Sequence, residues 1–353
     1  MADDRPLRVP NFKVEVDGKE ISGEIRSTVQ GVAFEEEINT ASMFIIRLST
    51  ANLEKGSWRY LDLADFKLGS EVKLYMGMDK VEPMITGEVT SLEPSFGKEQ
   101  SIIEVRGFDR LHRLRFGRKK RTFAGAKDSD IASTLAGDWG LSADAEDTGT
   151  VYPSIYQNNL NDFEFLLERA KRIRYEVMVD DKKLLFRKAR ENDAVSLTLE
   201  YRVDIDEFSC KLSTRYDANE VVVQGWDFMK KEAISAKAKE GNEVSKMSAD
   251  ETGTAMAKSA FGSSSSAVSA VIGEYLVDVS DAEKLAIARY NAQLVGFVTG
   301  EGKCQGIPGL RAGKNIDIKG LGKFSGTYYV TSTTHTIGSH GYDTSFKVRR
   351  VGV

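Results

Sequence analysis

The sequence predicts a mainly β protein in which an α+β insertion separates two similar β regions. Short runs of alternating apolar and polar residues, typical of half-buried strands, occupy both ends of the chain. Helical periodicity is confined to segments between those ends. The two β regions also share an order of strands and glycine turns. A chain of 353 residues is long enough for two or three domains.

The first hundred residues supply the first β region. Phe12, Val14 and Val16 alternate with polar residues and therefore share one face of a strand. We expect residues 1–110 to form a first β-barrel. Its clearest predicted strands are FKVEVDG (12–18), SMFIIRLS (42–49), EVKLYMG (71–77) and SIIEVRGF (101–108).

Residues 111–192 change in character and predict the α+β insertion domain. Ser129 is placed to cap a short helix through IASTLAGDW. A clearer helix follows in NDFEFLLERAKR, where Asn161 and Glu164 have the spacing of a capping box. The segment YEVMVDDKKLLFRK (175–188) predicts a hairpin that turns at its two adjacent aspartates.

The remaining chain returns to a β pattern around a polar interruption. Residues 193–230 and 296–353 predict a second β-barrel. Between them, 231–295 is rich in Ser, Ala and Lys, and we expect a flexible insertion with little core of its own, followed by a helix. Ser280 and Glu283 have capping-box spacing at the start of that helix.

The two β regions resemble each other in order. The segment LGSEVKLYMG (68–77) precedes a strand, a Gly-containing turn and a last strand within 85–108. The segment AGKNIDIKGLG (312–322) precedes the same succession within 324–350. A duplicated barrel with insertions would explain this echo, although β-hairpins also resemble each other by chance.

No pattern of residues predicts catalysis, a cofactor or a metal. The three histidines and two distant cysteines form no ligand spacing. The segment GIPGLRAGKN has the wrong glycine spacing for a phosphate loop, and a strand follows it where that loop needs a helix. We therefore expect no catalytic, cofactor-binding or metal-ligating residues and no enzyme. The amino-terminal segment also lacks a secretory signal, and no run is apolar enough to span a membrane.

The sharpest local feature is the basic run FDRLHRLRFGRKKRTF (108–123). The chain has 49 basic and 53 acidic residues and a net charge of −4, which disfavours a dedicated nucleic-acid binder. Phe108, Leu111, Leu114 and Phe116 have the character of core anchors with charges between them. The run is therefore a candidate subunit or tube interface, formed by Arg110, Arg113, Arg115, Arg118, Lys119, Lys120 and Arg121. The acidic stretch 35–37 is one candidate counterpart.

Three segments resemble a known family. FDRLHRLRFGRKKRTF, KDSDIASTLAGDWGL and YQNNLNDFEFLLERAKRIRYEVMVDDKKLLFRK are similar, in this order, to the central signature of phage late control protein D and VgrG-type baseplate hubs. The closing segment from IPGLRAGKN to KVRR resembles the end of the second barrel of such hubs. The resemblance covers roughly residues 8–353 and is weakest in the Ser-rich part.

This resemblance implies a structural role. Such hubs are homotrimers in which each chain supplies two tube-like β-barrels, so that three chains form a pseudo-hexameric ring. The ring joins a hexameric inner tube to a trimeric spike and contacts other baseplate proteins. The chain stops at KVRRVGV, without the neck and spike of VgrG, so we expect the spike to be a separate polypeptide. We expect assembly in the cytoplasm of the producing cell and a place in the baseplate of a phage tail or an injection particle.

Alternative functions remain open at this point. One alternative is the amino-terminal hub portion of a VgrG-type spike protein. A tail-associated cell-wall hydrolase would need a buried acidic pair in a groove within 124–192. Contact with nucleic acid through residues 110–121 is a further hypothesis, although nucleic acid is not expected as a specific partner. The sequence does not separate a phage tail from an injection system or a pyocin-like particle, or show whether cargo binds the hub.

Overall fold

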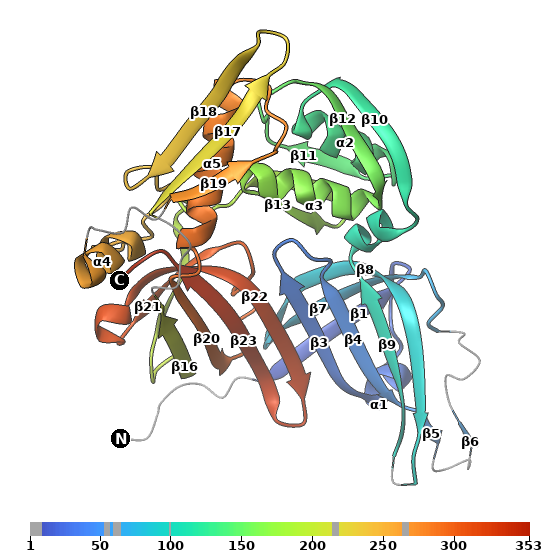
Figure 1. Ribbon diagram of the computed structural model, residues 1–353. Coiled ribbons are helices and arrows are strands. Elements are labelled where there is room, and N and C mark those ends of the chain that lie inside the picture. The colour runs from blue at the N-terminus through green and yellow to red at the C-terminus, as the bar shows by residue number, and fades with distance from the viewer. Residues whose placement is uncertain (1–8, 53–56, 59–64, 99, 214–218, 263–267) are drawn as a thin grey trace.

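The computed structural model describes most of the chain (Figure 1). The described residues are 9–52, 57–58, 65–98, 100–213, 219–262 and 268–353. Thirteen of the described strands join in one sheet, which forms one end of the molecule. Two smaller units lie at the other end, one built from the α+β insertion and one from β17–β19 and α5.

Residues before position 110 form the first half of the large sheet. Its strands are β1 (Pro10–Val16), β3 (Val29–Glu37), β4 (Met43–Ser49), β7 (Glu71–Met78), β8 (Lys80–Phe96) and β9 (Ser101–Phe108). Short elements accompany them: β2 (Lys19–Glu20), α1 (Gly23–Thr28), β5 (Ala51–Asn52) and β6 (Ser57–Trp58). The four strands predicted here are confirmed, and Val14 is buried between the partly buried Phe12 and Val16. Alternation places these side chains on one face, where they cover a core that includes Phe34, Phe44, Ile46 and Leu74.

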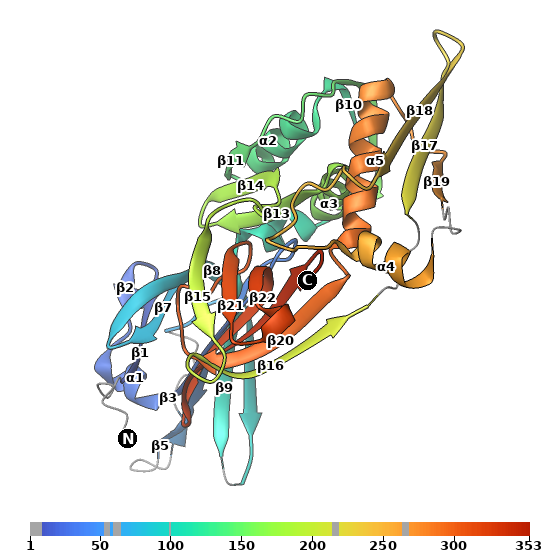
Figure 2. The same ribbon diagram turned by 90° about the vertical axis from the view of Figure 1, so that its left-hand side faces the viewer.

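The second half comes from the other end of the chain. Its strands are β15 (Val195–Glu200), β16 (Ile205–Leu212), β20 (Val298–Gln305), β21 (Asn315–Lys319), β22 (Gly326–Gly338) and β23 (Gly341–Arg350), with a 3₁₀ turn η2 (Gly322–Phe324). Figure 2 shows β15, β21 and β22 side by side, as their pairing requires. A second core lies under these strands and includes Ile316, Tyr328, Val330 and Phe346.

The two halves are a structural duplication. Numbered along the chain, the six main strands of each half lie in the sheet order 2-3-6-5-4-1, as β3-β4-β9-β8-β7-β1 and as β16-β20-β23-β22-β21-β15. The halves differ at their last strand, because β1 pairs antiparallel with β7 whereas β15 pairs parallel with β21. The echo in the sequence therefore reflects a repeated topology.

Two pairs of β-bulges establish which residues of the halves correspond. Strand β8 has one extra residue opposite β9 at Thr90, and β22 has one opposite β23 at Thr331. Strand β3 has an extra residue opposite β4, and β16 has one opposite β20 at the same place in the repeat. Backbone bonds agree, because Gly69 donates to the carbonyl of Val89 as Gly313 donates to that of Val330. A bulge fixes register, so these correspondences hold along each strand.

The halves join edge to edge at β3 and β22. The strands run antiparallel, with Phe34 opposite His335 and Glu35 opposite Thr334. The sheet consequently continues from one half into the other, where the sequence had suggested two distinct barrels. The predicted echo is confirmed, but the halves share one sheet because the edge of strand 2 in one half pairs with strand 5 of the other.

The α+β insertion follows the first half. It contains η1 (Arg110–Arg115), β10 (Lys119–Ala126), α2 (Asp128–Asp138), β11 (Ser142–Ala145), β12 (Tyr152–Leu160), α3 (Asp162–Ile173), β13 (Tyr175–Asp180) and β14 (Lys183–Lys188). The predicted capping box is confirmed, since Asn161 accepts a bond from the Glu164 N–H and Glu164 accepts one from the Asn161 N–H. The predicted hairpin also forms, with Asp181 in the left-handed region at its turn. Ser129 is not the cap of α2, because that helix begins one residue earlier.

The polar stretch after residue 219 differs from the prediction. Strands β17 (Glu220–Asp227), β18 (Glu232–Lys239) and β19 (Val268–Ile272) form a separate sheet, whereas 219–228 had been expected in the second barrel. Helix α4 (Gly253–Phe261) follows β18, and α5 (Val279–Leu294) packs on this sheet. The core that fills the interface places Ala236, Ala238, Ala282 and Ala286 among larger side chains such as Leu285 and Tyr290. Apolar content misled the prediction, because alanines pack closely without raising hydrophobicity much. The cap of α5 is Asp278 rather than Ser280.

Candidate interaction surfaces

The basic run begins with a clamp inside the chain. Arg110 is 4% exposed, and its guanidinium binds Glu71 Oε2 on β7 at 2.5 Å. The same guanidinium contacts Glu88 on β8 and Asp181 at the β13–β14 turn. Three acidic side chains from two units thus converge on one cation. Arg110 pins the α+β insertion to the first half of the sheet, and it is not available to another subunit.

The neighbours of Arg110 complete this joint. Asp109 caps η1 by accepting a bond from Leu111 N, and it also accepts one from Ser42 N at 2.8 Å. Burial raises the pKa of Asp109 to about 7. His112 donates a bond from Nδ1 to the Asp109 carbonyl, and Arg113 forms an ion pair with Glu88. The run FDRLHRLR is therefore a local structure that turns the chain from β9 into the insertion.

The anchors and the remaining cations divide between interior and surface. Leu111 and Leu114 are fully buried in the core of the insertion, as predicted, but Phe116 is 58% exposed. Most of the remaining cations contact side chains or carbonyls of the insertion. These contacts are Arg115 over the Phe163 ring, Arg118 with Asn159 and Glu164, Lys119 with Asp162 and the Trp139 ring, and Arg121 with Asp138 and the Phe123 ring. Lys120 is exposed on β10.

Glu36, in the middle of the acidic stretch 35–37, has a partner within the chain. Glu36 is buried and accepts two bonds from Arg311, at 3.0 Å from Nε and 2.9 Å from Nη2. It also accepts a bond from Ala312 N at 2.9 Å. The Arg311 guanidinium stacks over Phe34 and donates to the Met84 carbonyl. This cluster fastens the second half to the first half beside the β3–β22 ladder. Sequence reasoning missed it because its partners are far apart along the chain.

Two edges of the large sheet are open. Among the described strands, none pairs with β16 on the side away from β20, so β16 is the terminal strand of the sheet. Strand β8 pairs with β7 through residue 88 and with β9 from residue 88 onward. Residues 91–95 of β8 therefore have β9 on one side and no described strand on the other. An exposed edge is a template for pairing with another strand.

The buried titratable groups act in the packing. His335 on β22 is fully buried, and its ring nitrogens contact Tyr342 Oη, Thr344 Oγ1 and the Leu310 carbonyl, each at 3.0 Å. Burial lowers the pKa of His335 to about 4, so the ring is neutral. Burial raises the pKa of the Cys304 thiol to about 12, which keeps it protonated and unreactive.

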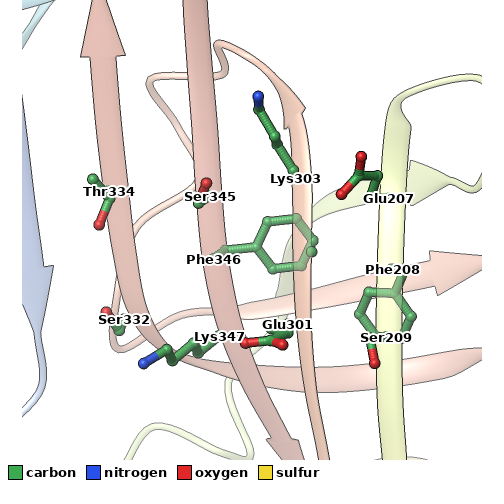
Figure 3. A pocket seen from close by; sticks show the side chains of 11 residues that line it. Glu207, Phe208, Ser209, Glu301, Lys303, Ser332, Thr334, Ser345, Phe346 and Lys347 are labelled. Carbon is green, nitrogen blue, oxygen red and sulfur yellow. The ribbon is translucent and has the colours of Figure 1, made fainter.

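The described residues contain no group of three His, Cys, Asp or Glu side chains that could hold a metal ion. Buried carboxylates within 124–192 serve as structural partners, since Asp128 pairs with Arg169 and Glu176 accepts a bond from Tyr329. A hollow of about 400 Å³ lies on the face of the second half and is lined by residues of β16, β20, β22 and β23 (Figure 3). The side chains that line this hollow carry both signs of charge.

None of the described helices is long and apolar enough to cross a membrane.

Sequence comparison identifies a family. A model described as the Alg8 N-terminal domain matches residues 7–339. The chain belongs to the Alg8 N-terminal domain family. The name of this family states no activity, and no curated protein matches the sequence.

Solved structures extend the comparison at the level of fold. The Alg8 N-terminal domain chain resembles the 43 kDa tail protein of prophage MuSo2 from Shewanella oneidensis, with a TM-score of 0.72 and 14% identity over 97% of this chain and 98% of the other. A tail protein from Neisseria meningitidis MC58 gives a TM-score of 0.66 and 13% identity over 97% of each chain. A type VI secretion component from Escherichia coli, described as structurally similar to phage T4 tail proteins gp27 and gp5, gives 0.59 and 12% over 96% of this chain and 76% of the other. The chain therefore has the fold of phage tail proteins.

Proposed function

We propose that the protein is a structural baseplate hub of a contractile tail-like machine. In this role three copies form a ring that joins a hexameric inner tube to a trimeric spike, and the hub performs no reaction itself. The observation that carries the proposal is the duplicated half-sheet, in which β16 and residues 91–95 of β8 have no described neighbour on one side. The fold shared with tail proteins and a type VI secretion component supports it.

A duplicated chain suits a change of symmetry. Each chain contributes two similar half-sheets, so three chains contribute six. The α+β insertion and the β17–β19 unit occur once per chain and lie at the opposite end from the sheet strands (Figure 1). A ring of three copies would therefore present sixfold similarity at one end and threefold symmetry at the other. A head-to-tail contact whose rotation closes is the general way to make such a ring.

The exposed cations of the basic run are the candidate contact residues in this proposal. Arg115, Arg118 and Lys120 remain at the surface of the insertion, whereas Arg110 is committed to contacts within the chain. We assign these three residues to contacts with a neighbouring subunit, the tube or other baseplate proteins. The particle would assemble in the cytoplasm of the producing cell and carry the hub in its baseplate.

The proposal is tested by mass photometry of the purified protein, alone and with the tube and spike proteins encoded beside it. We expect a species of three chains that binds both partners. A chain that stays monomeric at all concentrations and binds neither partner refutes the proposal. Neutralising Arg115, Arg118 and Lys120 together should weaken assembly while the single chain still folds, as circular dichroism would show, because the contacts that these side chains make within the chain lie at the surface. Unaltered assembly would refute the role assigned to these cations.

A further inference from the structure

The ladder between β3 and β22 is a template for a second ladder. In the repeat, β3 corresponds to β16, and β22 corresponds to β8. Within the chain β3 and β22 pair with each other, whereas their counterparts β16 and β8 each have an open edge among the described strands. The open pair does not form within one chain, where seven strand steps separate β16 from β8 along the described sheet. A second copy of the chain contains a strand of the matching kind for each open edge.

The bulges transfer the register of the internal ladder to the open edges. Thr90 corresponds to Thr331 on the strands that accept a partner, so Leu92, Glu93 and Pro94 correspond to Thr333, Thr334 and His335. On the other strand, Cys210, Lys211 and Leu212 correspond to Phe34, Glu35 and Glu36. The internal pairs then predict three intermolecular pairs, which are Leu92 with Leu212, Glu93 with Lys211, and Pro94 with Cys210.

The chemistry of these pairs is complementary. Leu92 and Leu212 fall on the side that faces the core, where their counterparts Thr333 and Glu36 are buried. Leu212 is 39% exposed in the single chain, so a partner strand would bury it. On the opposite face Glu93 meets Lys211, an acid opposite a base. Cross-strand pairs of opposite charge and of apolar side chains stabilise a ladder, whereas like charges destabilise it.

We propose that residues 91–95 of β8 pair antiparallel with residues 209–212 of β16 from a second copy of this chain, with Glu93 opposite Lys211. The contact repeats the internal β3–β22 ladder between molecules. Pro94 has no N–H to donate, so the new ladder has at least one backbone bond fewer than the internal one. This inference rests on the proposed function, because a closed ring needs one such contact between each pair of neighbours.

A single substitution tests the register. Residues directly opposite in an antiparallel ladder have Cα atoms about 4.5–5.5 Å apart, which suits a disulfide. Pro94→Cys places a thiol opposite the native Cys210, and Cys304 is too buried to compete. Oxidation with copper phenanthroline should link the ring covalently, so that a non-reducing denaturing gel shows a trimer. Two controls should remain monomeric on that gel: Pro94→Cys with Cys210→Ser, and Ser91→Cys, which lies about 10 Å from Cys210 along the ladder.

Charge reversal is a second test that needs no crosslink. Glu93→Lys or Lys211→Glu places like charges opposite each other. The upper end of such effects weakens the affinity of each contact about fivefold. Three contacts in a ring multiply this to about 100-fold in the monomer–trimer constant. The double variant should restore assembly, because the pair is then reversed rather than broken.

The outcomes separate this pairing from the proposed function. A wild-type chain that never assembles refutes both. An assembled wild-type protein in which Pro94→Cys forms no trimer, or Ser91→Cys crosslinks equally well, refutes the pairing alone. The pairing is also refuted if the double charge reversal assembles no better than the single variants.

Discussion

The pair of Glu36 and Arg311 gives the most direct test of how the two halves hold together. We consider Arg311→Met, which keeps an unbranched side chain about as long as the arginine stem and removes the charged guanidinium. Glu36 then stays buried with only the bond from Ala312 N, having lost both guanidinium bonds. Removing one partner of a buried ion pair costs about 3–5 kcal/mol. The side chains of Arg311 and Glu36 are 22% and 9% exposed, so we expect about 3 kcal/mol, the lower end of that range.

Differential scanning calorimetry measures this loss. An unfolding entropy of about 2.1 cal/mol/K per residue gives about 0.74 kcal/mol/K for the whole chain, so Tm should fall by about 4 °C. Lys303→Met is the matched control, because the Lys303–Asp343 pair is exposed and separated by 3.7 Å, and it should change stability by less than about 0.5 kcal/mol. Glu36→Gln combined with Arg311→Met should cost less than the two single changes together, since no charge is left buried. If Arg311→Met is as stable as the wild type, the pair does not fasten the halves.

Three further predictions concern titration and packing. His335 has a folded pKa lowered to about 4, so its contribution to stability is lost as pH falls from about 6.5 toward 4, and His335→Gln should show a shallower acid loss in urea unfolding. Asp109 has a folded pKa raised to about 7, so its contribution is lost as pH rises from about 4 to 7. Wild-type stability measured against Asp109→Asn should therefore decline over that interval, and a constant difference would contradict the burial argument. Gly107→Ala would place a Cβ 2.2 Å from the Glu88 carbonyl oxygen and 2.3 Å from the Phe44 ring, and should cost about 3 kcal/mol or more. Gly137→Ala in α2 meets nothing within 4 Å and should stabilise by about 0.5–1 kcal/mol in the same assay.

Local patterns were sufficient to place most elements. Alternation located β1 and β7, and dense apolar runs with β-branched residues located β4 and β9. The spacing of Asn161 and Glu164 located the start of α3. These signals act between residues close together in the chain. The Ala-rich strand β18 escaped prediction because two of its three buried residues are alanines. Its stability comes from packing against α5 rather than from the intrinsic preference of the strand.

The interaction surfaces could be predicted only in part. The basic run was recognised, but its charge suggested outward contacts, whereas Arg110 meets Glu71, Glu88 and Asp181 within the chain. A linear sequence does not show which acids fold toward a cation. The open edges could not be predicted from composition either, because they depend on which strand of each half has no described strand on one of its sides. The register, carried by bulges at Thr90 and Thr331, became available only from the strand pairing.

The two junctions of the repeat use different chemistry, and the difference fits when each would form. The internal junction contains the buried Glu36–Arg311 pair, which is sequestered as the chain folds around it. The open edges carry Leu212 where the internal junction has Glu36, and Leu92 where it has Thr333, with charged Glu93 and Lys211 on the other face. Charged residues and Pro94 make an edge strand less prone to unspecific pairing while the edge is exposed to solvent before assembly. An edge that must remain soluble as a monomer and then accept one partner needs such a balance, whereas a junction made during folding does not.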